Sequence, residues 1–152
     1  MYRFVPAEVE HATLISTNLA PFLEEELLAL KDQPVEKTIA EGITKSDDSW
    51  SAFDDEGIIA IFGVRRIHLL SDKAVPWLIT SNLIHKHKRD FLKAAKLSIA
   101  HWLTQYDVLE NYIPAGFPFL LRWIEWAGFK VSPAKKYGLT NKVLHRIEKR
   151  RT

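Results

Sequence analysis

One stretch, residues 75–129, constrains the fold more than any other part of the chain. Its apolar run at 75–80 predicts a buried strand, and an apolar stripe at helical spacing predicts a long helix over 87–104. A second strand at 108–113 and a second helix at 119–126 complete a β-α-β-α unit. Such a unit brings a helix N-terminus to the carboxyl end of a strand, where backbone N–H groups can hold an anion.

The loop before the long helix is dense in cationic side chains. Lys86, Lys88 and Arg89 lie there with His85 and His87. Cations at a helix N-terminus oppose the helix dipole by several tenths of a kcal/mol, so a compensating reason is expected. We therefore weigh an anion site against the alternative of a solvated helix start. The two histidines have no thiolate or acid cluster to support them, and we predict no metal site.

Length and composition indicate an ordinary single domain over residues 1–152. The formal net charge is +2, so the molecule as a whole has no field that would mark a nucleic-acid binder. The chain has no cysteine, which excludes disulfides and thiolate chemistry. We find no secretory signal and no apolar run of about 18 residues. We expect a soluble, cytoplasmic protein without a membrane partner.

The remaining segments extend the same reading to an α+β fold. Gly63 indicates a bulge or a close approach inside a buried strand, and Gly128 fits a helix C-cap. We expect one mixed central sheet of about six to seven strands with helices on both faces, an α/β sandwich. The other expected elements are strands at 1–5, 49–53, 57–67, 130–132 and 141–147, helices at 6–15, 24–30 and 35–42, and a hairpin turn at 54–57.

This order of elements, together with several short motifs, resembles the GCN5-related N-acetyltransferase (GNAT) superfamily. Within it the chain is most similar to the GNAT-like proteins of tailed phages, including internal virion proteins. The motifs that carry the resemblance are Trp77-Leu78-Ile79-Thr80-Ser81, the run from Lys88 to Lys93, Tyr106-Asp107 with Asn111-Tyr112, and Phe119-Leu120 through Ala127-Gly128-Phe129.

The resemblance implies acetyl-CoA as a co-substrate. The family's loop pattern, Gln/Arg-x-x-Gly-x-Gly/Ala, places His85, Lys88 and Asp90 at its defined positions, so both glycines are missing here. Glycine serves where a backbone must lie close to a ligand. Two alternatives follow: the usual phosphate cradle is distorted here, or the side chains of Lys86, Lys88 and Arg89 grip the pyrophosphate instead. The implied cofactor-binding residues are Leu78, Ile79, Thr80, His85, Lys86, His87, Lys88, Arg89 and Asp90.

The resemblance also implies a proton donor for the departing thiolate and a general base. Ile124 occupies the position where the family often has a tyrosine, and Tyr112 is the nearest substitute. Glu110, on the same expected strand, is the candidate base. Each has a structural alternative: Glu110 could form a salt bridge on the sheet face, and Tyr112 could be an ordinary packed strand aromatic.

The leading interpretation is an acyl-CoA-dependent N-acetyltransferase acting on a primary amine of a small molecule or a protein. Its rival is a catalytically silent GNAT-fold phage protein with virion or phage partners, located in the host cytoplasm or the virion. The lost glycines favour the rival, and the basic loop favours the enzyme. A third reading, a nucleic-acid adaptor using the loop and the basic tail at 149–152, is disfavoured, and the tail is expected to be solvated. The oligomeric state stays open, a homodimer included.

Overall fold

The computed structural model describes residues 2–116, 118–137 and 142–151. The chain divides into two compact units, the first comprising residues 1–65 and 77–95 and the second residues 66–76 and 96–152. The backbone passes from one unit to the other within β4 (Lys73–Thr80) and within α4 (Lys88–Trp102). The single domain expected over the whole chain stays a prediction.

The order of elements is that of an α+β protein. Among the described residues, eight strands form one mixed sheet in the order β1-β2-β3-β4-β5-β8-β6, with β7 paired to β8. The predicted fold class is confirmed, and the sheet exceeds the expected six to seven strands because β7 is a two-residue strand in a segment expected to be a loop. The other elements are β1 (Arg3–Pro6), α1 (Glu10–Ser16), α2 (Pro21–Leu30), α3 (Val35–Lys45), β2 (Asp48–Phe53), β3 (Ile58–Arg66), the 3-10 helix η1 (Asn82–Lys86), β5 (Val108–Pro114), α5 (Pro118–Trp126), β6 (Lys130–Val131), β7 (Lys135–Lys136) and β8 (Val143–Arg150).

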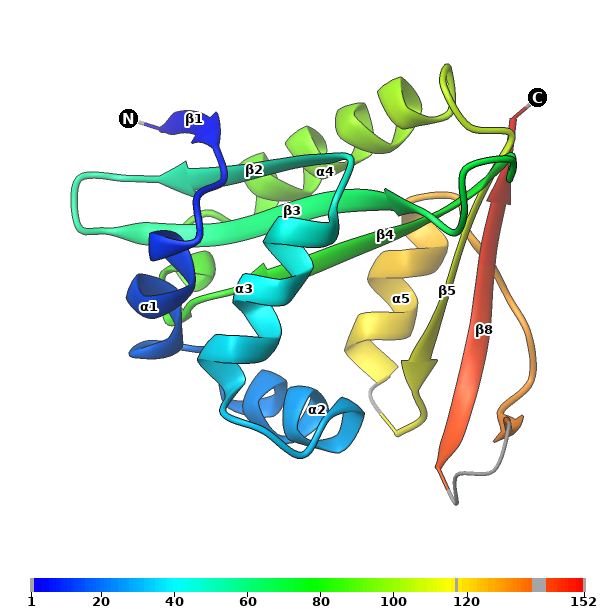
Figure 1. The fold of residues 1–152 in the computed structure, drawn as a ribbon, viewed down its shortest axis with the longest axis horizontal. Coiled ribbons are helices and arrows are strands. Elements are labelled where there is room, and N and C mark those ends of the chain that lie inside the picture. Colours follow the sequence, from blue (N-terminus) through cyan, green and yellow to red (C-terminus); the bar gives the residue numbers. More distant parts are fainter. Residues whose placement is uncertain (1, 117, 138–141, 152) are drawn as a thin grey trace. The chain divides into compact units, whose positions relative to one another are not determined.

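A three-stranded antiparallel ladder begins the first unit. β1 pairs with β2, and β2 returns as β3 through a tight turn (Figure 1). Gly57 lies in this turn at φ +151°, a conformation that side chains with a Cβ rarely adopt. The Oδ1 atom of Asp54 accepts hydrogen bonds from the backbone N–H groups of Glu56 and Gly57, at 2.7 and 3.0 Å. The predicted hairpin at 54–57 is therefore confirmed.

Helices cover both faces of β3 within this unit. Ile58 and Ile61 share one apolar cluster with residues of α1, α2 and α3, and Phe62 contacts Phe91 in the first half of α4 at 6.0 Å between ring centroids. The first seven residues of β3 are all buried. Complete burial of an isoleucine side chain contributes about 1.5–3 kcal/mol, so this strand is the centre of the unit's core.

Gly63 permits a close approach inside the first unit. A Cβ atom at this position would lie 2.8 Å from the backbone oxygen of Asp48 and 2.9 Å from the indole of Trp77. The register shift of the β2–β3 ladder falls between Ala52 and Phe53 instead. Of the two roles that the sequence indicated for Gly63, the close approach is the one that the structure confirms.

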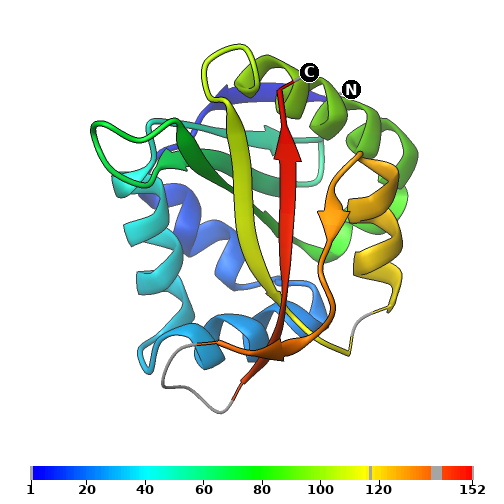
Figure 2. The same cartoon turned by 90° about the vertical axis from the view of Figure 1, so that its right-hand side faces the viewer.

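The second unit is built on an antiparallel pair, β5 with β8, flanked by β6 (Figure 2). Leu109, Ile113 and Ile147 alternate along one buried face, as a pleated strand requires. Gly128 follows α5 at φ +97°, which confirms the expected C-cap. No described helix is both long enough and apolar enough to cross a bilayer.

The predicted C-terminal strand is confirmed with shifted bounds, whereas the tail expected to be solvated is partly held by hydrogen bonds to the fold. β8 begins two residues later than expected and continues to Arg150. The Lys149 ammonium donates to the carbonyl of Ala127 at 2.9 Å, and the Arg151 guanidinium donates to that of Leu103 at 2.6 Å. Lys149 and Arg151 are thus held by carbonyl acceptors at the ends of helical segments, where positive charge is favourable, while Arg150 pairs with Glu148.

Candidate active site

The parallel ladder between β4 and β5 gives way to a side-chain contact at Pro76. Cα partners join Lys73 to Val108 and Ala74 to Leu109. Proline has no N–H to donate to a ladder. The contact there is made by Asn111, whose side-chain N–H donates to the Pro76 carbonyl at 2.8 Å. A proline inside a predicted central strand was the sequence signal for this irregularity, which the sequence reading missed.

Ser81 fixes the start of the loop that follows β4. It is fully buried, its N–H donates to the carbonyl of Ile59 at 2.8 Å, and its hydroxyl donates to that of Ile58 at 2.7 Å. The Oγ and carbonyl oxygen of Ser81 accept hydrogen bonds from the N–H groups of Leu83 and Ile84, both at 3.2 Å. Two N–H groups of the predicted anion loop are therefore used within the loop itself.

Two of the predicted cofactor residues are paired with acids of the β2–β3 turn. Lys86 Nζ lies 2.5 Å from Glu56 Oε1, and this hydrogen bond raises the pKa of Lys86. His87 Nε2 lies 2.7 Å from Asp54 Oδ2. Asp54 is buried, and the hydrogen bond from His87 lowers the pKa of its carboxyl group. The acidic turn at 54–57 and the basic loop are complementary in charge, which is the only sequence signal that could have linked them.

The pairs Lys86–Glu56 and His87–Asp54 form a clamp between the β2–β3 turn and the basic loop. Tyr2, near the N-terminal end of the chain, adds to this clamp. Its hydroxyl lies 2.7 Å from Nδ1 of His87 and donates to Asp90 Oδ2 at 2.9 Å. Partial burial and the hydrogen bond to Asp90 raise the pKa of Tyr2. Asp54, Glu56 and Tyr2 were not predicted as site residues, because nothing in the local sequence marks a contact across 30 or more positions.

His85, Lys88 and Arg89 are exposed and have no acidic partner among the described residues. The strand residues ahead of them are more enclosed. The Ile79 side chain belongs to the apolar core, and the Thr80 carbonyl accepts from the N–H of Ala20 at 3.1 Å. The structure therefore leaves three of the predicted loop residues available to an external anion.

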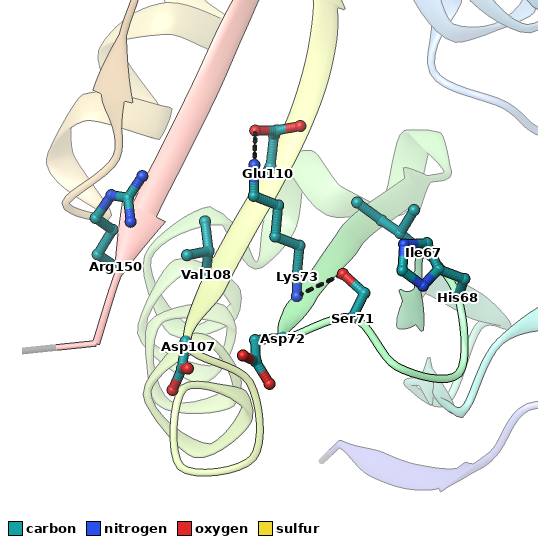
Figure 3. A pocket seen from close by; sticks show the side chains of 9 residues that line it. All are labelled: Ile67, His68, Ser71, Asp72, Lys73, Asp107, Val108, Glu110 and Arg150. Atoms are coloured by element: carbon teal, nitrogen blue, oxygen red, sulfur yellow. Dashed lines mark hydrogen bonds and ion pairs between the residues drawn. The ribbon is translucent and has the colours of Figure 1, made fainter.

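Glu110 lies in an ion-pair network of the second unit. Its carboxylate accepts from Arg146 and lies 3.7 Å from Lys73 Nζ. Figure 3 shows Lys73 extended toward Glu110 while its backbone N–H donates to the hydroxyl of Ser71. These residues line an open cavity of about 570 Å³ together with Ile67, His68, Asp72, Asp107, Val108 and Arg150. The geometry agrees with the structural alternative for Glu110, and its catalytic role stays a prediction.

Tyr112 is 40% exposed on the same strand. Its ring meets that of Tyr137 edge-on, with 4.8 Å between centroids. Ile124, at the family's tyrosine position, is buried in α5. Nothing in these contacts marks Tyr112 as a proton donor, and that role also stays a prediction. In the part of the chain that the structure describes, no group of three or more His, Asp or Glu side chains could hold a metal ion.

Solved acetyltransferases share this fold over nearly the whole chain. Spermidine N-acetyltransferase from Vibrio cholerae, solved with CoA and spermine, superposes with a TM-score of 0.72 at 10% identity, covering 99% of this chain and 95% of that one. Ribosomal-protein-alanine N-acetyltransferase from Brucella melitensis superposes with a TM-score of 0.72 at 11% identity, and the match covers 97% of this chain and 99% of that one. A putative phosphinothricin N-acetyltransferase superposes with a TM-score of 0.70 at 14% identity, and the match covers 100% of this chain and 99% of that one.

These superpositions define the class of structure: the chain has the fold of GNAT-type N-acetyltransferases, as its sequence predicted. No family model and no curated protein matches the chain. The likeness is one of fold, at identities of 10–14%.

Proposed function

We propose that this protein is an acyl-CoA-dependent N-acetyltransferase that transfers an acetyl group to a primary amine. One observation carries the proposal. The parallel backbone ladder of β4 and β5 pairs Lys73 and Ala74 with β5, whereas at Pro76 the contact is made by the side chain of Asn111. A strand released from its ladder has main-chain groups free to pair with the amides of a pantetheine arm. The shared fold with three amine acetyltransferases supports the same reading.

The loop residues divide into two roles in this proposal. His85, Lys88 and Arg89 are exposed and would hold the phosphate groups of acetyl-CoA. Lys86 and His87 are paired with Glu56 and Asp54 and would support the loop. Asp90, bonded to Tyr2, would do the same. Leu78, Ile79 and Thr80 would contribute main-chain contacts.

Acetyl-CoA supplies an acetyl group activated as a thioester. The amine nitrogen forms a bond to the carbonyl carbon, the carbon–sulfur bond breaks, one proton leaves the nitrogen and one proton reaches the sulfur. Glu110 is the proposed proton acceptor and Tyr112 the proposed proton donor. Correct positioning of the reactants supplies much of the rate in such reactions, so a weak acid or base does not abolish transfer.

The acceptor that fits best is a cationic amine. The first unit has 14 Asp and Glu against 9 Lys and Arg, a formal charge of −5. Such a surface attracts positively charged substrates. The named acetyltransferases include enzymes for spermidine and for a ribosomal-protein alanine, so the fold takes both small-molecule and protein amines.

A thiol-release assay with acetyl-CoA and a panel of amines tests the proposal. We expect free thiol to appear faster with spermidine, or with a lysine-containing peptide, than with neutral amines. A reaction without acceptor is the control for hydrolysis. Absence of acceptor-dependent thiol release across the whole panel would contradict the proposal.

The second candidate is a catalytically silent interaction protein with the same fold. The internal pairing of the loop favours it, since the N–H groups of Leu83 and Ile84 and the side chains of Lys86 and His87 already have partners. This candidate predicts neither acetyl-CoA binding nor turnover. Phage or virion partners, a cytoplasmic location and a homodimer stay predictions.

A further inference from the structure

The net charge of +2 conceals an uneven distribution of charge. The second unit has 12 Lys and Arg against 5 Asp and Glu, a formal charge of +7. Residues 126–147 contain five Lys and Arg and not one Asp or Glu. A block of positive charge without acids is typical of segments that contact polyanions.

This segment forms one edge of the second unit through β7. Lys135 and Lys136 are exposed and lie opposite Leu144 and Val143 of β8. Successive strand residues point to opposite faces, so the two lysines place positive charge on both sides of the edge. Lys142 immediately precedes β8 and adds a third cation.

Two tyrosines accompany these cations. The ring of Tyr137 meets that of Tyr112 at 4.8 Å, and the Lys135 ammonium lies 4.9 Å from the Tyr137 centroid. The Tyr112 side chain remains 40% exposed. We name Tyr112, Lys135, Lys136, Tyr137 and Lys142 the β7 basic surface.

Among the residues that the structure describes, the lysines of the β7 basic surface form no ion pair with an acidic side chain. Other cations of the unit, Arg146, Arg150 and Arg151, are bound to Glu110, Glu148 and Asp107. Lys136 and Lys142, in contrast, have no acidic partner among the described residues. Lysine on an edge strand also prevents edge-to-edge association, but that role explains neither the contact between Tyr112 and Tyr137 nor the absence of acids.

We propose that the β7 basic surface binds single-stranded nucleic acid. The lysines would contact phosphates on both sides of the edge, and the tyrosine pair would offer a ring on which an unpaired base stacks. Sequence-independent single-strand binding combines these two elements, a cationic track and aromatic rings. A purely electrostatic contact with a lipid surface would gain nothing from the edge-to-face contact of Tyr112 and Tyr137. Tyr112 belongs both to this surface and to the proposed catalytic pair, so the test below measures binding through the lysines and Tyr137 and does not use acetyl transfer.

Fluorescence anisotropy with labelled 20-nucleotide RNA and DNA strands tests the proposal. We expect binding at low salt that weakens as salt rises, because bound phosphates release counterions. The double variant K135E/K136E should bind at least about tenfold more weakly, with a salt dependence less steep by about 1.4 in log–log slope. Tyr137→Ala should weaken binding about 5- to 100-fold.

The matched control is K37E/K45E, which makes the same change in charge at exposed positions of α3 in the first unit. It should leave the affinity within about twofold, because those lysines lie outside the β7 basic surface. Thermal melting confirms that each variant is folded. Three results would each overturn the proposal: no salt-sensitive binding of either strand, equal losses in the control, or binding to phosphatidylserine vesicles without binding to oligonucleotides.

Discussion

At the scale of single residues, Asp54 shows how much of the candidate site depends on one side chain. One carboxylate oxygen closes the β2–β3 turn, and the other holds His87. The sequence predicted the turn from its Asp and Gly content, because turn chemistry is local. It could not predict the partner, because His87 lies 33 positions away and the contact exists only after the strands have paired.

Asp54→Asn should lower the free energy of unfolding by about 1–3 kcal/mol at neutral pH, since a charge-assisted bond to His87 is lost. The pKa of Asp54 is held below its ordinary value of 3.8, so its contribution is complete above that value and is lost as pH falls through the folded-state pKa. Urea unfolding between about pH 6 and about pH 3 should therefore show the difference from the wild type shrinking at the acidic end. Asp32→Asn, at an exposed position, is the control, and an equal effect there would refute the clamp.

Gly63 gives a second prediction at this scale. Gly63→Ala should destabilise the protein by about 1–3 kcal/mol, because its Cβ would meet the Asp48 carbonyl and the Trp77 ring at under 3 Å. Gly42→Ala, within α3 and with open space around its Cβ, should be neutral or stabilising by about 0.5–1 kcal/mol. Thermal unfolding of the two variants measures both. A neutral Gly63→Ala would disprove the close approach.

At the scale of elements, sequence periodicity predicted the long helices and strands well. The helix expected at 87–104 is α4 at 88–102, and the strand expected at 108–113 is β5 at 108–114. Patterns fail where pairing rather than burial defines the element. β7 is two exposed lysines, and its strand geometry comes from its ladder with β8. The end of β8 is equally rich in charge and was expected to be a tail.

The β5–β8 ladder also explains why Glu110 is paired. It lies directly opposite Glu148, and the guanidinium of Arg146 bonds to both carboxylates. Like charges opposite each other destabilise a sheet unless a cation separates them. The hydrogen bond from Arg146 accordingly lowers the pKa of Glu148.

Glu110→Gln should therefore destabilise the protein by about 1–3 kcal/mol, because Arg146 loses half of its charge compensation. Glu125→Gln, exposed on α5, should change stability by less than about 0.5 kcal/mol. Chemical denaturation of both variants is the measurement. An unchanged stability for Glu110→Gln, combined with loss of acetyl transfer, would instead identify a catalytic carboxylate.

At the scale of the whole molecule, the order of strands and helices was enough to predict the fold, because few topologies accommodate it. The site was predicted in part. The basic loop was found from its composition, whereas its neutralisation by Asp54 and Glu56 was not, since it depends on tertiary contacts. The uneven charge of the two units could have been found from sequence, but only with the unit boundaries known.

Calorimetric titration with acetyl-CoA tests the central claim most directly. The account predicts micromolar binding to the wild type and a loss of at least about tenfold in K88A/R89A, since those cations would contact phosphate. K86A should lose less than about threefold in affinity for acetyl-CoA, because the Lys86 ammonium is already paired with Glu56. No heat at millimolar acetyl-CoA, or a loss in K86A equal to that in K88A/R89A, would contradict it.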